Sequence, residues 1–224
     1  GSQTSVEGNT REITINLQQA VRGGEKVSVQ EKEITFSKGE VMITITTAAS
    51  LEGINGEKTA VVRSISLEHQ PVTGQFMDTG MVAASFRADL MSLPSEDSAI
   101  TARVTKNPAL PAQAGFDRAA AEEGYQLDAV AYTMDIAKTN LDDGKDIGQA
   151  TVTMSVSPSW VEEHGGAASV RIARFADDGT SQILNTRYLG IDSSANQIFE
   201  GTSPGGLSIF ALITIREPAA DVQT

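Results

Sequence analysis

Short segments in which apolar and polar residues alternate constrain this chain more than any other feature of its sequence. The clearest runs from Ala150 to Val156, where every second residue is apolar and the residues between them are Thr or Ser. A period of two places the apolar side chains on one face of a half-buried strand. The same alternation is present at residues 41–45, 82–90, 100–104 and 130–136. Residues 207–215 are apolar on both faces, which predicts a central strand covered on both sides.

Residues that favour tight turns separate these segments at short intervals. Examples are Asn55-Gly56, Asp143-Gly144, Asp178-Gly179 and Pro204-Gly205-Gly206. Many short strands with frequent reversals predict a mainly β protein, an antiparallel β-sandwich of one or two subdomains. Asp178-Gly179 lies between residues 170–172 and 182–184 and gives the strongest hairpin signal.

Two segments interrupt the β pattern and predict short helices. Residues 111–124 begin with Pro and end with Gly, and they carry Phe116 on an apolar face that we expect to pack on a sheet edge. Residues 157–165 have Ser157 as N-cap, Pro in the first turn and Gly165 at the end. The predicted structural anchors of the fold are Phe116, Tyr132, Trp160 and Phe210.

The length of 224 residues suits one large β-domain or two small ones. We expect residues 1–24 to be a flexible start that opens with an expression scar, Gly1-Ser2, and residues 218–224 to be a tail. The apolar pattern is weakest between Pro94 and Pro111. This predicts an N-terminal β-sandwich half at 25–105 and a C-terminal half with both helices at 106–217, as separate sandwiches or one intertwined domain.

Composition excludes several classes of site and partner. Seventeen Lys and Arg against 29 Asp and Glu give a formal net charge of −12, the opposite of a nucleic-acid-binding surface. There is no Cys, which excludes disulfides and thiolate sites, and two His cannot form a histidine-rich metal site. No apolar run reaches the 18 or so residues that a membrane-spanning helix needs.

His69 and His164 are the only histidines on which a Ser-His-acid or similar constellation could be built. His164 falls at the C-terminus of the second predicted helix, where a cation meets the negative end of the helix dipole, so a structural role suffices. His69 precedes Gln70-Pro71, and we expect it at a strand exit, exposed to solvent. We therefore predict no catalytic residue.

Two acidic turns are weak candidates for calcium sites. They are Asp142, Asp143 and Asp146 in one turn, and Asp192, Ser194 and Asn196 in the other. The second has the oxygen spacing of a calcium loop but lacks a bidentate acid at the right distance. Because Asp, Asn and Ser also favour turns for their own hydrogen bonds, plain turns are the preferred interpretation, and no metal or cofactor is predicted.

Motifs in the C-terminal part resemble a known family. They include Met154-Ser155-Val156-Ser157-Pro158-Ser159-Trp160-Val161, His164-Gly165-Gly166, Asp178-Gly179-Thr180 and Ser203-Pro204-Gly205-Gly206-Leu207-Ser208-Ile209-Phe210. Together they resemble the PGF-pre-PGF type domain of large methanogen cell-surface proteins, over about residues 81–215. Gly206 and Leu207 stand where that domain has Phe in an SPGFS-like element. The resemblance implies an extracellular module of an archaeal envelope, without catalytic residues to carry over.

These inferences lead to three hypotheses of function. The first is a non-enzymatic structural module of an archaeal cell-surface protein, whose partners are other envelope or surface proteins. The second is an extracellular binding or adhesion module for a glycan or a partner protein, although aromatic residues make up only 5% of the chain. The third is a hydrolase, which would need a polar cluster in a deep cleft with shifted pKa values.

Overall fold

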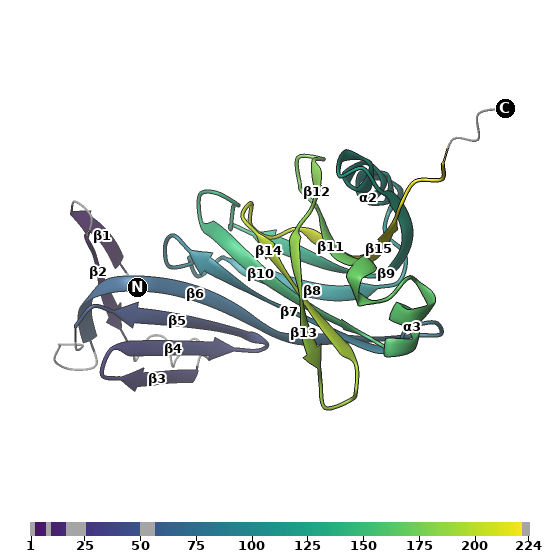
Figure 1. The fold of residues 1–224 in the computed structure, drawn as a ribbon. Coiled ribbons are helices and arrows are strands. Elements are labelled where there is room, and N and C mark those ends of the chain that lie inside the picture. The colour runs from purple at the N-terminus through teal and green to yellow at the C-terminus, as the bar shows by residue number, and fades with distance from the viewer. Residues whose placement is uncertain (1–2, 8–9, 17–25, 50–56, 221–224) are drawn as a thin grey trace. The chain divides into compact units, whose positions relative to one another are not determined.

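Strands dominate the chain, as the alternating pattern predicts (Figure 1). The computed structural model describes residues 3–7, 10–16, 26–49 and 57–220. The strands are β1 (Gln3–Glu7), β2 (Thr10–Asn16), β3 (Lys26–Gln30), β4 (Glu33–Lys38), β5 (Val41–Thr47), β6 (Glu57–Phe76), β7 (Gly80–Leu90), β8 (Ala99–Thr105), β9 (Gln126–Thr139), β10 (Ile147–Val156), β11 (Val170–Phe175), β12 (Ser181–Ile183), β13 (Asn185–Ile191), β14 (Gln197–Ser203) and β15 (Ile209–Arg216). The helices of this part are α2 (Leu110–Glu122), α3 (Pro158–Glu163) and a short 3-10 turn, η1 (Ala167–Ser169). The predicted antiparallel β-sandwich with two short helices is confirmed.

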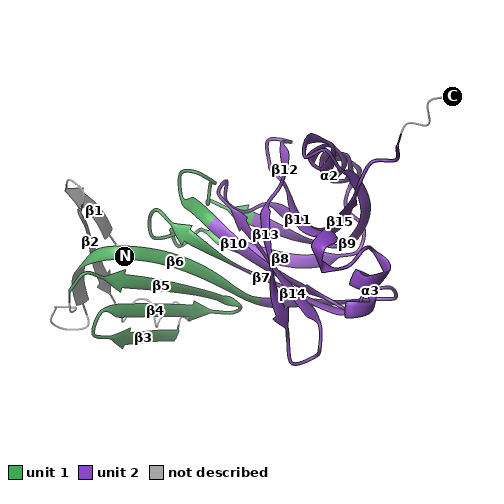
Figure 2. Ribbon diagram, in the orientation of Figure 1, with its two compact units in different colours: residues 1–70, 87–99, 138–149 green, residues 71–86, 100–137, 150–224 purple. Residues whose placement is uncertain are grey.

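The chain divides into two compact units, each built from segments that are far apart in sequence (Figure 2). Unit 1 takes its residues from 1–70, 87–99 and 138–149, and unit 2 from 71–86, 100–137 and 150–224. Strands β6 to β10 each contribute residues to both units. The proposed division into 25–105 and 106–217 stays a prediction.

Unit 1 contains an antiparallel run of strands in which β4 lies between β3 and β5, and β5 pairs with β6. Ile34 of β4 lies opposite Ile45 of β5, which lies opposite Ile65 of β6. All three side chains are buried. Such a row of facing β-branched residues fixes the register, since a slip by one residue would turn them outward.

His69 corrects one expectation from the sequence. Its side chain is 3% exposed, whereas the sequence suggests a solvated position at a strand exit. Strand β6 continues through Pro71, and His69 follows Ile65 and Leu67 on the buried face of that strand. Because alternate residues of a strand share a face, the His69 ring lies on the same buried face as Ile65 and Leu67.

Unit 2 contains a five-stranded antiparallel sheet in the order β12-β11-β15-β9-β8. Strand β15 lies between β11 and β9, and Phe210 and Leu212 are both fully buried. The predicted central strand covered on both faces is therefore confirmed. The second sheet of this unit contains strands in the order β13-β14-β10-β7-β6.

A tyrosine and a glycine show how these two sheets of unit 2 contact each other. The Tyr132 hydroxyl of β9 lies 2.7 Å from the carbonyl oxygen of Ser155 in β10 and 3.1 Å from that of Ala83 in β7. Gly201 of β14 lies so close to β11 that a Cβ placed on it would be 3.1 Å from the Cβ of Ile172. The tyrosine supplies a polar bond between the layers, and the glycine lets the backbones approach.

Helix α2 packs against β11 and the edge strand β12 through an apolar face. Phe116 is fully buried in a cluster with Ala112 and Ala120 of the helix and with residues of β11 and β15. Pro occupies the first turn, and Gly124 has φ +81°, the left-handed conformation expected just after the helix. The helix is where the sequence predicts it.

Helix α3 has the predicted cap and anchor. The Trp160 N–H donates to the Ser157 hydroxyl at 3.4 Å, and the Trp160 side chain is 1% exposed. Gly165 has φ +97° and ends the segment. In the described part of the chain, no helix is long and apolar enough to cross a membrane.

The Asp178-Gly179 signal correctly predicts a hairpin, because β11 pairs antiparallel with β12. The loop is longer than the two residues that such a dipeptide suggests, since β11 ends at Phe175 and β12 begins at Ser181. Asp178 holds the loop by accepting bonds from the Thr180 N–H at 3.0 Å and the Thr180 hydroxyl at 2.6 Å. The carboxylate thus shapes a wider turn than sequence alone implies.

Candidate functional site

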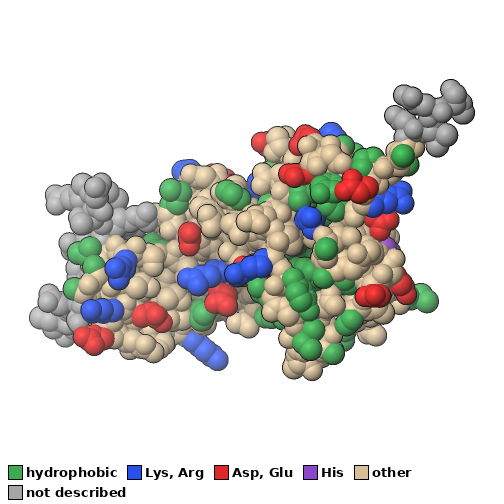
Figure 3. Space-filling view, in the orientation of Figure 1, with side chains coloured by type: hydrophobic (Ala, Val, Ile, Leu, Met, Phe, Trp, Pro, Cys, Tyr) green, Lys and Arg blue, Asp and Glu red, His purple; other side chains and the backbone are tan. Residues whose placement is uncertain are grey.

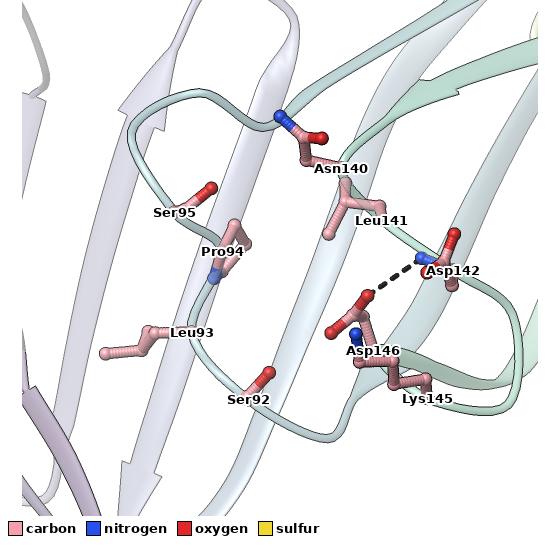
Figure 4. Close-up of a pocket in the computed structure, with 9 residues that line it drawn as sticks. All are labelled: Ser92, Leu93, Pro94, Ser95, Asn140, Leu141, Asp142, Lys145 and Asp146. Atoms are coloured by element: carbon pink, nitrogen blue, oxygen red, sulfur yellow. Dashed lines mark hydrogen bonds between the residues drawn. The ribbon is translucent and has the colours of Figure 1, made fainter.

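A small open pocket in unit 1 is the candidate ligand site of the described residues. Its volume is about 290 Å³. The lining comes from two loops, one after β7 and one between β9 and β10, and consists of Ser92, Leu93, Pro94, Ser95, Asn140, Leu141, Asp142, Lys145 and Asp146 (Figure 4). Hydroxyl, amide, carboxylate and ammonium groups surround a few apolar side chains there. Such a lining suits a small ligand rich in hydroxyl groups better than an apolar one.

The loop between β9 and β10 is held by its own backbone and side chains. Asn140 has φ +53°, and its side-chain amide donates to the Asp97 carbonyl at 3.2 Å. The Asp142 N–H donates to the Asp146 carboxylate at 2.9 Å (Figure 4). The Asp142 carbonyl also accepts from the Asp146 N–H at 2.8 Å. Asp146 therefore closes this turn with its side chain and its backbone.

A buried ion pair connects this loop to the end of β9. The Lys138 ammonium is 2.5 Å from the Asp143 carboxylate, and the two side chains are 6% and 17% exposed. A charge pair this far from water is costly unless its partners stay together, so we expect removal of either residue to destabilise the loop. In the acidic turn at 142–146, the Asp146 carboxylate accepts a backbone N–H and the Asp143 carboxylate pairs with Lys138.

The second acidic turn uses its oxygens in the same way. The Asp192 carboxylate accepts from the N–H groups of Ser194 at 2.8 Å and Asn196 at 3.0 Å. The Asn196 side-chain amide donates to the Met81 carbonyl at 2.8 Å. Among the residues that the structure describes, no three His, Cys, Asp or Glu side chains gather as metal ligands would.

Both histidines are engaged within the fold, and neither lines the pocket. His164 Nδ1 lies 2.7 Å from the Trp160 carbonyl, and its ring stacks on the indole with centroids 4.3 Å apart. His69 Nδ1 lies 2.7 Å from the Gln70 carbonyl, and Nε2 is 3.8 Å from the Glu40 carboxylate.

Three groups with shifted pKa values also lie outside the pocket. Burial raises the pKa of Tyr132, whose hydroxyl joins the sheets of unit 2. Burial raises the pKa of Asp78, but the hydrogen bond from Lys106 and the charge of Lys106 together bring it below its usual value. The hydrogen bonds of the Thr180 hydroxyl and N–H lower the pKa of Asp178. Each shift has a structural cause in a loop or in the core.

Sequence reasoning did not find the pocket. Residues 92–95 lie where the apolar pattern of the sequence is weak. They form the pocket together with residues 140–146, and no pattern in the sequence indicates that these two loops of unit 1 are neighbours. Asp142 and Asp146, which the sequence offers only as weak calcium candidates beside the preferred interpretation of a plain turn, both line the pocket. The sequence does not predict the buried ion pair of Lys138, because one lysine in a strand looks like any exposed lysine until its burial is known.

Comparison of the chain with protein-family models, with curated proteins and with solved structures finds no match.

Proposed function

We propose that this chain is a non-enzymatic structural module of an archaeal cell-surface protein. The observation that carries the proposal is that the polar groups best suited to chemistry are bonded inside the fold. His164 stacks on Trp160, Tyr132 joins two sheets, and Lys138 pairs with Asp143. A module of this kind uses its polar side chains to hold strands and loops together.

The proposed location rests on the resemblance of residues 81–215 to domains of methanogen surface proteins. The acidic, strand-rich chain is compatible with that setting, since its net charge of −12 keeps molecules apart in solution. Other envelope or surface proteins are its proposed partners.

Labelling of intact cells tests the location. An antibody raised against residues 57–220 is applied to intact and to lysed cells of the organism that encodes the chain. We expect similar signals from both preparations, while an antibody against a ribosomal protein reacts only after lysis. A signal that needs lysis contradicts the surface location.

A substrate panel tests the non-enzymatic role. The purified chain is incubated with chromogenic esters, glycosides and peptides, beside the variant His164→Gln. We expect no turnover above the buffer rate from either protein. Turnover by the wild-type chain that falls in the variant would favour the hydrolase hypothesis instead.

A binding module for glycans is the second candidate, and the pocket lined by Ser92 and Lys145 favours it. Neutral oligosaccharides offer the hydroxyl groups that such a lining can bond. Titration calorimetry with a set of neutral oligosaccharides tests this, with Ser92→Ala and Lys145→Ala as pocket variants and Lys26→Ala as a control outside it. Binding that weakens in both pocket variants and not in the control supports this candidate; heat signals equal in all four proteins contradict it.

A further inference from the structure

Strand β13 carries a strip of exposed apolar side chains at the edge of its sheet. Tyr188 is 47% exposed, Leu189 43% and Ile191 64%. Figure 3 shows hydrophobic side chains gathered on the surface over the β13–β14 hairpin. Large apolar side chains this exposed and this close together are typical of surfaces that bind another polypeptide.

One edge of β13 pairs with β14, and no strand among the described residues pairs with its other edge. Strand β11 contacts the chain where β13 begins: the Leu184 N–H donates to the Ile172 carbonyl at 2.9 Å, and the Ile172 N–H donates to the Thr186 hydroxyl at 2.9 Å. Residues 187–192 follow this contact. Alternate N–H and C=O groups of an edge strand point away from its neighbour and can bond a further strand.

The sequence of this open segment is complementary to itself in antiparallel pairing. Residues 187–192 are Arg-Tyr-Leu-Gly-Ile-Asp. When a second copy is laid antiparallel with Arg187 opposite Asp192, Tyr188 falls opposite Ile191 and Leu189 opposite Gly190. A two-fold axis then generates each pair twice, as an interface between identical surfaces requires.

A β-bulge in β13 puts these pairs on matching faces. Tyr188 lies opposite the buried Phe199 and Gly190 opposite Ile198, so Leu189 is the extra residue. In a regular strand, residues 188 and 191 would point to opposite faces. The bulge shifts the alternation, so Tyr188 and Ile191, which lies opposite Gln197, share the inner face.

Charge decides which occupant suits this edge. The Arg187 guanidinium donates to the Glu200 carboxylate at 2.9 Å. Because the Arg187 side chain is 71% exposed, the guanidinium remains accessible to a second carboxylate. Asp192 of a second copy supplies that carboxylate twice per dimer: its Oδ1 accepts the N–H groups of Ser194 and Asn196 within its own copy, and Oδ2 is the oxygen proposed to meet the guanidinium. From this complementarity we infer that two copies of the chain pair antiparallel through residues 187–192, which are the last part of β13 and the residue that follows it.

The overall charge sets the conditions for this pairing. Two copies at −12 each repel over distances comparable to the Debye length, about 10 Å at 0.1 M salt. A short pairing segment makes a small interface, so we expect a dissociation constant of about 10 µM to about 1 mM at ~0.3 M potassium chloride.

A charge-exchange experiment by sedimentation equilibrium tests the inference. Arg187→Asp brings like charges together twice in the dimer, and so does Asp192→Arg. Each variant alone should self-associate at least about tenfold more weakly than the wild-type chain. An equimolar mixture of the two variants restores both opposite-charge pairs, so it should form a mixed dimer at about the wild-type concentration.

Further variants separate this effect from misfolding and from charge in general. Ile191→Lys changes a side chain that is already 64% exposed, and it should also weaken the dimer. Arg103→Asp removes a comparable exposed ion pair, Arg103 with Asp135, and should leave the dimer unchanged. Circular dichroism of each variant verifies the fold.

Three results would overturn the inference. In the first, the wild-type chain stays monomeric at about 1 mM in ~0.3 M salt. In the second, Arg187→Asp and Asp192→Arg each dimerise as strongly as the wild type. In the third, the equimolar mixture of these two variants associates no more strongly than either variant alone. A monomeric wild-type chain would leave a strand of a different protein as the occupant of this edge.

Discussion

Trp160 is the residue through which helix α3 is fixed within unit 2. Its side chain is 1% exposed and stacks on His164, the residue that follows the helix. Trp160→Ala should lower the free energy of unfolding by about 3 to 5 kcal/mol, because it removes a large buried side chain and leaves a cavity. Urea titration followed by circular dichroism measures this loss.

The same titration includes Leu110→Ala as a control, because Leu110 of α2 is 85% exposed. That variant should change the free energy of unfolding by about 0.5 kcal/mol or less. If Trp160→Ala costs below about 1 kcal/mol with an unchanged m-value, the indole is accessible and the glycan-binding hypothesis gains weight.

Asp78 makes stability depend on acid pH. Lys106 lies 2.6 Å from its carboxylate, and its hydrogen bond and charge outweigh burial and lower the pKa of Asp78. The pKa of Asp78 is lower in the folded protein than in the unfolded chain. The pair with Lys106 therefore contributes its full stability at pH values above the unfolded-state pKa. That contribution is lost as the pH falls through the folded-state pKa. Asp78→Asn should therefore cost stability near neutral pH and nothing in strong acid.

The Asp78 side chain is 47% exposed, so solvent screens the pair and the cost at neutral pH should be about 1 kcal/mol or less. Urea titrations of both proteins from about pH 2 to about pH 7 measure the difference. Glu162→Gln, a change of an exposed acid in α3, serves as the control. A cost that persists unchanged into acid would show that the carboxylate charge is not its source.

At the scale of elements, the close approach of β14 and β11 gives a prediction for Gly201. An added Cβ would lie 3.1 Å from the Cβ of Ile172 and 3.2 Å from a methyl of Leu184, closer than ordinary contact. Gly201→Ala should destabilise the protein by about 1 to 3 kcal/mol, because the two strands must move apart. Thermal and urea unfolding measure the change.

Gly148 of β10 is the matched control, because an added Cβ there would meet its nearest atoms at 3.6 and 3.7 Å. Gly148→Ala should be neutral, or stabilising by up to about 1 kcal/mol, since Ala restricts the unfolded chain. Equal effects of the two substitutions would show that the sheets of unit 2 accommodate a methyl group at Gly201.

Elements whose signals are local were predictable from the sequence. Helix α3 has its cap, its proline and its terminal glycine within nine residues, and strand β15 carries its own apolar pattern on both faces. The 20-residue strand β6 was not predicted, because Pro71 suggests an end that the structure does not have. The pocket and the open edge of β13 depend on which loops and strands become neighbours, and a pattern of period two does not contain that information.

At the scale of the whole molecule, the described ion pairs do not balance the charge. Several of them are exposed on at least one side, such as Arg187 with Glu200 and Arg216 with Asp128. Pairs of this kind contribute little, while an excess of 12 negative charges repels throughout the chain. Lys138 with Asp143 is buried, so salt screens that pair much less.

Salt should therefore stabilise the fold. Raising potassium chloride from about 0.1 M to about 1 M shortens the Debye length from about 10 Å to about 3 Å, which weakens repulsion between acids more than it weakens short ion pairs. We expect the Tm to rise steadily over this range at a protein concentration low enough to keep the chain monomeric. Arg187→Gln breaks an exposed pair and removes one positive charge, so the net charge becomes more negative by one. This variant should melt lower in dilute salt and approach the wild-type Tm at high salt. A Tm that falls with salt would mean that attraction between paired charges outweighs repulsion among the acids, and would favour a binding module whose acids hold cations or basic partners.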